Sequence, residues 1–211
     1  MSDFVISREE YLRNPCFVSS IPYWKVQNLQ IPPNLHIVHH RLFDPSLWTG
    51  FQVERYFRLS HYLDDVDRPT LTAGFSVAEC SLGMYAAYIS DCYPSLHMLE
   101  EALAQYLTHP VYRSELWLAI RDDQTGAIVA SGIGEYDPDM REGILEWIQV
   151  LPEYRRMGLG SFVVRELLWR MHGIADFATV SGRCDNPTNP EGLYRACGFS
   201  GNDVWHILRK V

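Results

Sequence analysis

The sequence contains very little lysine and no regular cysteine pattern. Only two of its 18 basic residues are lysines, against 26 acidic residues, and the formal net charge is −8. This negative balance argues against nucleic-acid binding, because neutralising phosphates requires a basic face. The five cysteines are odd in number and form no Cys-x-x-Cys pair, which argues against a disulfide framework and against a zinc ribbon.

Several sequence signatures are also missing. No stretch has the length and apolarity of a membrane span or a secretory leader, so we expect no membrane association and a cytoplasmic location. There is no Gly-x-Ser-x-Gly elbow of a serine hydrolase, no nucleoside-triphosphate loop and no dinucleotide fingerprint. Histidines 36, 39, 40 and 61 have no carboxylate or cysteine partner placed by the sequence, so no metal site is predicted.

Apolar residues make up 47% of the chain, which is ample for a core, and their spacing predicts a mixture of strands and helices. The pattern predicts strands at residues 35–43, 51–63, 70–79, 115–121, 127–134, 177–183 and 204–209. It predicts helices at residues 7–13, 84–93, 95–107 and 190–197. A further strand and helix, at residues 144–150 and from residue 159 onward, flank the most informative turn in the chain.

This strand and helix define the turn between them. In the strand, alternation predicts that Glu146, Ile148 and Val150 share one face. Pro152 ends the strand because it cannot donate to the ladder. After the turn, the apolar residues recur at helical steps of three and four: Leu159, Phe162, Val163, Leu167 and Met171.

The turn itself is basic and rich in glycine. Glycines at the start of a helix let backbone N–H groups approach an anion, and the helix dipole favours negative charge there. Neighbouring arginines add forked donors for phosphate. The turn therefore predicts a pyrophosphate cradle, in which two members act through backbone N–H groups (Met157 and Leu159) and the others are Arg155, Arg156, Gly158, Gly160 and Ser161. The same glycines could instead permit close packing of the helix on the strand.

A second informative segment lies about forty residues further on, at residues 186–199, and reads Asn-Pro-Thr-Asn-Pro-Glu-Gly-Leu-Tyr-Arg-Ala-Cys-Gly-Phe. Together with Arg-Arg-Met-Gly-Leu-Gly, in this order, it resembles the two motifs of the GNAT acetyltransferase superfamily. The resemblance covers roughly residues 75–211. It implies an α/β (α+β) fold of GNAT type, with a mixed twisted β-sheet flanked by helices.

The domain organisation follows from the same resemblance. A polar, turn-like stretch at residues 64–69 predicts a boundary between an N-terminal extension, residues 1–68, and the acetyltransferase domain, residues 69–211. We expect the extension to be a substrate lid or a protein-docking element. The oligomeric state is not set by the sequence, which leaves a homodimer open.

The resemblance also implies the activity. We expect an N-acetyltransferase that moves the acetyl group of acetyl-coenzyme A directly to a primary amine, in a ternary complex without a metal. The amine acceptor is a small molecule or a protein amino group. The alternative is a non-catalytic sensor or interaction module that binds coenzyme A or an acyl-coenzyme A.

The resemblance assigns roles to individual residues. The main chain of Ile148, Gln149 and Val150 is expected to bind the pantetheine arm. Tyr194 matches the tyrosine that protonates the departing sulfur, with a helix-face tyrosine packed on the sheet as its other reading. Glu146 is the candidate general base, with an arginine-paired sheet carboxylate as its other reading. Three further carboxylates are alternatives for the base: Glu135, Asp137 and Glu142.

Two asparagines compete for one family position. The family asparagine precedes its tyrosine by seven residues, whereas Asn186 lies eight and Asn189 five residues before Tyr194. The simplest interpretation places Asn186 on the pantetheine arm and Asn189 at the start of the helix as its cap. The reverse assignment stays open.

Overall fold

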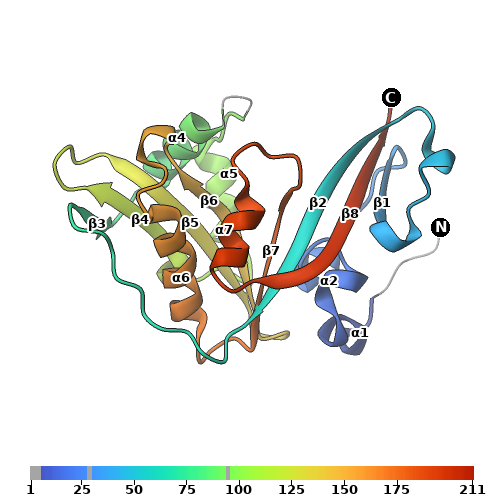
Figure 1. The fold of residues 1–211 in the computed structure, drawn as a ribbon, viewed down its shortest axis with the longest axis horizontal. Coiled ribbons are helices and arrows are strands. Elements are labelled where there is room, and N and C mark those ends of the chain that lie inside the picture. The colour runs from blue at the N-terminus through green and yellow to red at the C-terminus, as the bar shows by residue number, and fades with distance from the viewer. Residues whose placement is uncertain (1–5, 28–29, 94–95) are drawn as a thin grey trace. The chain divides into compact units, whose positions relative to one another are not determined.

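The computed structural model describes residues 6–27, 30–93 and 96–211 (Figure 1). The chain divides into two compact units. The continuous unit is formed by Tyr62–Ala178, and the composite unit combines residues 1–61 with Thr179–Val211. The division falls inside strand β7 (Phe177–Arg183).

The continuous unit contains four strands in the order β6-β5-β4-β3, and every neighbouring pair is antiparallel. These strands are β3 (Phe75–Ala78), β4 (Trp117–Asp122), β5 (Ile128–Asp137) and β6 (Glu142–Val150). The helices are α4 (Leu82–Cys92), α5 (Glu100–Tyr106), α6 (Leu159–Met171) and the 3-10 turns η3 (Ser114–Leu116) and η4 (Pro152–Tyr154). The predicted β4–β5 hairpin is confirmed, and the carboxylate of Asp122 accepts from two N–H groups of its turn.

The helices of this unit pack on both faces of its sheet. Helix α6 packs closely on β5 and β6, where an added Cβ at Gly132 would lie 2.6 Å from Val163 and one at Gly143 would lie 2.5 Å from Met171. Helices α4 and α5 contribute to a buried cluster with the strand residues Ala119 and Ile133. The sheet therefore has an α6 face and an α4/α5 face.

The composite unit takes its strands from both ends of the chain. Strand β8 (Ser200–Lys210) pairs antiparallel with β1 (Leu35–His39) on one side and with β2 (Phe51–Tyr62) on the other, and β2 is followed by β7. Its short helices are α1 (Arg8–Arg13), α2 (Pro15–Val18), α3 (Tyr23–Val26), α7 (Pro190–Ala196) and the 3-10 turns η1 (His40–Leu42) and η2 (Pro45–Trp48). Residues 1–61 thus supply two of the four strands of this unit.

Most of the predicted elements are present, with changes at their ends. The strand predicted at 35–43 ends at His39, because the next residues form η1. The first strand predicted for the acetyltransferase domain is shorter, since β3 begins at Phe75. Helix α5 begins at Glu100, whereas its predicted start, residue 95, lies together with residue 94 outside the described residues. The predicted division at residue 68 stays a prediction.

A buried arginine anchors the composite unit. Arg58 on β2 is 2% exposed, and its guanidinium donates to the Tyr11 hydroxyl at 2.9 Å and to the Ser181 hydroxyl at 3.1 Å. Tyr11 belongs to α1 and Ser181 to β7, so one side chain links three elements of the unit. A buried cation is costly unless its donors are satisfied, and these hydrogen bonds compensate part of that cost.

Candidate functional site

Strand β6 contains a bulge at Trp147. Its pairing with β5 changes register between Ser131↔Gln149 and Ile133↔Glu146, so one extra residue of β6 is inserted there. Trp147 has a φ of 50°, in the left-handed region that non-glycine residues rarely adopt. At a bulge the extra residue is left out of the ladder. Peptide groups of β6 are therefore not paired to β5 at this point.

The bulge corrects one prediction from the sequence. Residues paired across an antiparallel ladder project to the same face. Glu146 pairs with Ile133 and therefore lies on the α4/α5 face. Ile148 lies on the α6 face, where its side chain borders Gly132, and Val150 follows it two residues later. The expectation that Glu146, Ile148 and Val150 share one face is wrong, because the inserted residue reverses the alternation.

The end of β6 beyond the bulge is held by buried polar contacts. The Gln149 side chain is 6% exposed, and its Nε2 donates to the Ser131 hydroxyl at 3.0 Å. The Tyr88 hydroxyl, from α4, donates to the Val129 carbonyl at 2.8 Å, and burial raises the pKa of Tyr88 well above its usual value. In the described part of the chain, Oε1 of Gln149 has no hydrogen-bond partner. A buried unpaired acceptor calls for a functional explanation.

The predicted cradle residues form the turn that leads into α6. Arg156 and Gly158 both have left-handed backbones, with φ of 68° and 83°. The 13-residue helix α6 begins at Leu159 and has no side-chain cap. The first N–H groups of a helix have no partner within the helix. This turn therefore presents backbone donors at the positive end of the α6 dipole, and a diphosphate group fits this arrangement.

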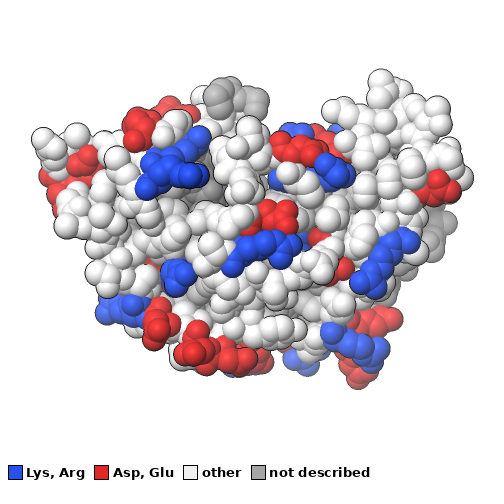
Figure 2. Space-filling view, viewed as in Figure 1, with Lys and Arg blue, Asp and Glu red and all other residues white. Residues whose placement is uncertain are grey.

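The two arginines of the turn are exposed but differ in their contacts. The Arg155 Nε donates to the Val150 carbonyl at 3.2 Å, so this side chain folds back over the end of β6. The Met157 carbonyl accepts from the Thr72 hydroxyl at 3.3 Å, which ties the turn to the segment before β3. Basic and acidic side chains are interspersed on the molecular face shown in Figure 2.

Three predicted site residues, Tyr194, Asn186 and Asn189, lie in the composite unit. Tyr194 on α7 is 6% exposed, and its ring lies 5.7 Å from Phe199 and 6.1 Å from Phe57 between centroids. Asn189 caps α7, as predicted, by accepting from the Gly192 N–H at 3.2 Å. Asn186 Oδ1 instead accepts from the Thr188 N–H and hydroxyl. The acid role of Tyr194 and the pantetheine role of Asn186 stay predictions.

A series of side-chain contacts that the sequence did not reveal begins at the bulge. The Trp147 Nε1 donates to the Tyr106 hydroxyl at 3.1 Å, and the rings of Tyr106 and His109 lie 5.1 Å apart. The His109 Nδ1 lies 3.7 Å from a carboxylate oxygen of Glu135, which is 2% exposed. Because these residues follow no shared motif or spacing, only the folded arrangement brings them together. Asp137 and Glu142, the other alternative bases, are also buried.

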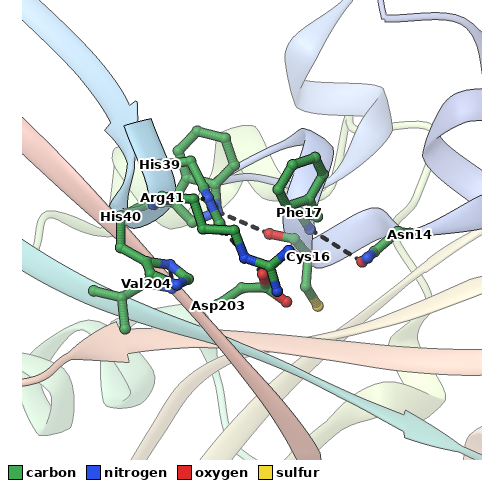
Figure 3. A network of polar contacts seen from close by, with 9 residues as sticks. Asn14, Cys16, Phe17, His39, His40, Arg41, Asp203 and Val204 are labelled. Carbon is green, nitrogen blue, oxygen red and sulfur yellow. Dashed lines mark hydrogen bonds and ion pairs between the residues drawn. The ribbon is translucent and has the colours of Figure 1, made fainter. Parts of the chain in front are cut away.

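One side-chain cluster in the composite unit has the composition of a metal site (Figure 3). Potential ligand atoms of His39, His40 and Asp203 lie within 4.8 Å of one another. However, Nδ1 of each histidine accepts a backbone N–H, from Arg41 at 3.4 Å and from Val204 at 3.2 Å. These bonds place the imidazole proton on Nε2, and His39 Nε2 then donates to Asp203 Oδ1 at 2.9 Å. An ion would have to displace these hydrogen bonds.

None of the helices in the described parts of the chain combines the length and the apolar character that a membrane span requires. None of the five cysteines, all of which lie among the described residues, forms a disulfide bond.

One family model matches part of the chain. Residues 112–201 match the model of the acetyltransferase (GNAT) domain. This range includes the bulge, the cradle and Tyr194. No curated protein matches the chain.

Solved structures share the fold at low sequence identity. A GCN5-related N-acetyltransferase from Sphaerobacter thermophilus has a TM-score of 0.67 and 18% identity, over 83% of this chain and 58% of that one. A GNAT-family acetyltransferase from Colwellia psychrerythraea has a TM-score of 0.59 and 11% identity, over 83% and 64%. Ard1 from Thermoplasma volcanium has a TM-score of 0.52 and 16% identity, over 66% and 99%.

The chain spans less than two thirds of the length of the first two of these proteins. Its mixed α/β architecture agrees with theirs, as the sequence predicted. Residues 112–201 thus match the GNAT acetyltransferase domain, and the fold that the chain shares with GNAT structures agrees with this match.

Proposed function

We propose that the protein is an N-acetyltransferase that uses acetyl-coenzyme A and transfers the acetyl group directly to a primary amine. The observation that carries this proposal is the combination, within the continuous unit, of the β6 bulge at Trp147 and the uncapped start of α6. The two features are joined by residues 148–158. One offers unpaired peptide groups and the other a cluster of backbone donors, which suits a ligand with an amide-containing arm and a diphosphate.

The cradle binds through its backbone and through Arg156. Consecutive N–H groups in a left-handed turn form a concave site for anions, and the α6 dipole adds to it. The Arg156 guanidinium contributes a charge-assisted hydrogen bond. The side chain of Arg155 is partly engaged by Val150 and mainly holds the end of β6 in place.

The strand end and the bulge position the rest of the ligand. When bound, acetyl-coenzyme A supplies a thioester, whose carbon accepts the amine. The main chain of Ile148, Gln149 and Val150 orients the pantetheine arm, and an N–H group at the bulge stabilises the charge that develops on the thioester oxygen. Gln149 offers its buried Oε1 as an additional acceptor for this arm.

Proton transfer completes the reaction. Tyr194 is proposed to give a proton to the departing sulfur, since a phenol has a basicity close to that of a thiolate. Asn186 is proposed to bind the pantetheine arm. Glu146 remains a carboxylate candidate for the base on the α4/α5 face.

Calorimetry with coenzyme A tests the cradle. We expect wild-type protein to bind coenzyme A and Arg156→Glu to weaken binding by roughly tenfold or more, because a charge-assisted bond becomes a repulsion. Arg165→Glu is the matched control, since Arg165 is an exposed arginine further along α6. Equal binding by all three proteins would contradict the proposed cradle.

Transfer is tested separately by thiol release from acetyl-coenzyme A with a panel of primary amines and peptides. We expect release that depends on at least one amine. Tyr194→Phe should slow turnover by roughly 10- to 1000-fold and leave coenzyme A affinity nearly unchanged. Binding without release across the panel would instead indicate a non-catalytic module that binds coenzyme A.

A further inference from the structure

A buried carboxylate faces a partly exposed imidazole on the α4/α5 face of the continuous unit. The side chain of Glu135 is 3% exposed and that of His109 is 30% exposed, with 3.7 Å between Glu135 Oε1 and His109 Nδ1. The loop that carries His109 is fixed to the sheet, because the Tyr136 N–H donates to the Val111 carbonyl at 2.9 Å. The imidazole thus has one nitrogen at ion-pair distance from a carboxylate, while part of the ring is exposed to solvent.

This pair is connected to the bulge through two aromatic side chains. Tyr106 contacts the His109 ring and accepts the hydrogen bond from Trp147 Nε1. The same face carries Glu146, which pairs with Ile133 next to the bulge. His109 is therefore two side-chain contacts away from the peptide groups to which the thioester is assigned.

We infer that His109 is the general base for the acceptor amine and that Glu135 is the residue that positions it. This inference rests on the proposed acetyl transfer. A histidine with a carboxylate beside its second nitrogen is a common arrangement for a general base, because the carboxylate favours one ring orientation and stabilises the imidazolium. Imidazole has an unperturbed pKa near 6.5, which suits proton removal at neutral pH better than that of an ordinary carboxylate.

The proton balance of the step is simple. The amine nitrogen forms a bond to the acetyl carbon while the carbon–sulfur bond breaks. His109 Nε2 takes one proton from that nitrogen and becomes an imidazolium, which the Glu135 carboxylate stabilises. The departing sulfur receives one proton from the acid, and the products are an amide and a free thiol.

Charged and aromatic groups from several elements surround His109. Glu135 faces it from β5, the tilted ring of Tyr106 contacts it from α5, and Glu146 lies on the same face of the sheet. The nearby Arg113 directs its guanidinium over the Tyr136 ring, 5.4 Å from the centroid. Loss of the Glu135 charge should therefore make the His109 imidazolium less stable.

The test compares His109→Gln, Glu135→Gln and Glu146→Gln with the control His172→Gln, which replaces an exposed histidine at the end of α6. We expect His109→Gln to lower kcat by roughly 10²- to 10⁴-fold, to abolish the acidic limb of the pH–rate profile and to leave the Kd for coenzyme A unchanged. Added imidazole should restore part of the rate. Glu135→Gln should move the acidic limb of the pH–rate profile to lower pH. The control His172→Gln should change neither kcat nor this profile.

NMR titration of the histidine side chains gives a readout that does not depend on activity. The His109 signals should titrate at lower pH in Glu135→Gln than in wild type, and an unchanged titration would overturn the pairing. Unchanged transfer in His109→Gln would overturn the assignment of the base but not the proposed acetyl transfer. The same holds if the acidic limb of the pH–rate profile is lost only in Glu146→Gln. A wild-type protein that transfers to no amine would overturn the proposed function as well.

Discussion

The two units of this protein are built from the chain in different ways. In the continuous unit, β3, β4, β5 and β6 are neighbours in the sheet in the same order as in the sequence. In the composite unit, β8 near the C-terminus pairs with β1 and β2 near the N-terminus, for example Leu35 with Arg209. Local pairing forms with little loss of chain entropy, whereas pairing of distant segments requires a large loop to close first.

This difference bears on what residues 1–68 do. As an extension they would be dispensable for folding, but β1 and β2 border β8 on both sides. A lid or docking role stays a prediction. The structural contribution of residues 1–68 can be measured by comparing variants of the composite unit with variants of the continuous unit.

Deletion of residues 1–68 should have the largest effect. It leaves β8 without its β1 and β2 partners and removes the buried side chains of Phe57 and Leu59. We expect insoluble protein, or protein without a cooperative thermal transition by circular dichroism. Removal of residues 1–5 is the control. A soluble 69–211 fragment with a sharp transition would show that the composite unit does not depend on its N-terminal strands.

Arg58→Ala should be the most damaging of the point substitutions considered. It removes the donor to Tyr11 and Ser181 and leaves a cavity among three elements of the composite unit. We expect a loss of about 2–4 kcal/mol in the free energy of unfolding, measured with urea. Arg183→Ala, at a side chain that is 55% exposed, should cost less than about 0.5 kcal/mol. Equal losses of unfolding free energy in Arg58→Ala and Arg183→Ala would contradict the proposed anchoring role of Arg58.

Gly132→Ala tests the packing of the continuous unit. The added methyl would lie 2.6 Å from the Val163 side chain and 2.8 Å from the Ile148 side chain, so these side chains or α6 must shift. We expect a loss of about 1–3 kcal/mol in unfolding free energy. Gly126→Ala serves as the comparison, since its φ of 75° is unfavourable for alanine but no atom lies within 4 Å, and it should cost about 1 kcal/mol. A fully tolerated Gly132→Ala would contradict the close contact of α6.

The stability of the composite unit should depend on pH through two buried histidines, His39 and His206. Burial is the main cause that lowers the pKa of both His39 and His206, and Arg55 adds to the effect at His206. The unfolded chain then binds protons more readily than the native state, so stability is complete above about pH 6.5 and falls as the pH decreases below it. Each histidine contributes at most about 1.4 kcal/mol per pH unit.

His206→Phe should reduce this slope. The ring stacks on Phe43 at 3.8 Å, and its Nδ1 has no hydrogen-bond partner among the described residues, so phenylalanine keeps the packing and removes the titration. Urea denaturation of wild type and variant between pH 5 and 8 measures the difference. An identical slope would show that His206 does not contribute.

The predictable features depended on local signals. The turn before α6 follows from Pro152 and the two glycines, and α7 follows from Asn189 and the proline after it. In each case a residue with a restricted or permissive backbone marks a boundary. These signals lie within a few residues of the structure that they determine, so they can be recognised without knowledge of the fold.

The features that escaped prediction depended on insertion or on distance. Nothing in Leu-Glu-Trp-Ile-Gln marks a left-handed residue, because tryptophan favours strands and the usual glycine or asparagine is absent. The error over Glu146 follows directly from that hidden bulge. The pairs His109–Glu135 and Arg58–Tyr11 join residues that are far apart in the sequence, and no local pattern determines which polar residues meet in a core.

Hydrogen exchange measured by mass spectrometry, with and without coenzyme A, tests the central claim most directly. The bulge and the uncapped start of α6 should bind the ligand together, so amides in residues 147–161 should exchange more slowly when it is present. Residues 35–39, which form β1, should be unaffected. Slower exchange in residues 147–161 would support the account, whereas unchanged exchange there at saturating coenzyme A would contradict it.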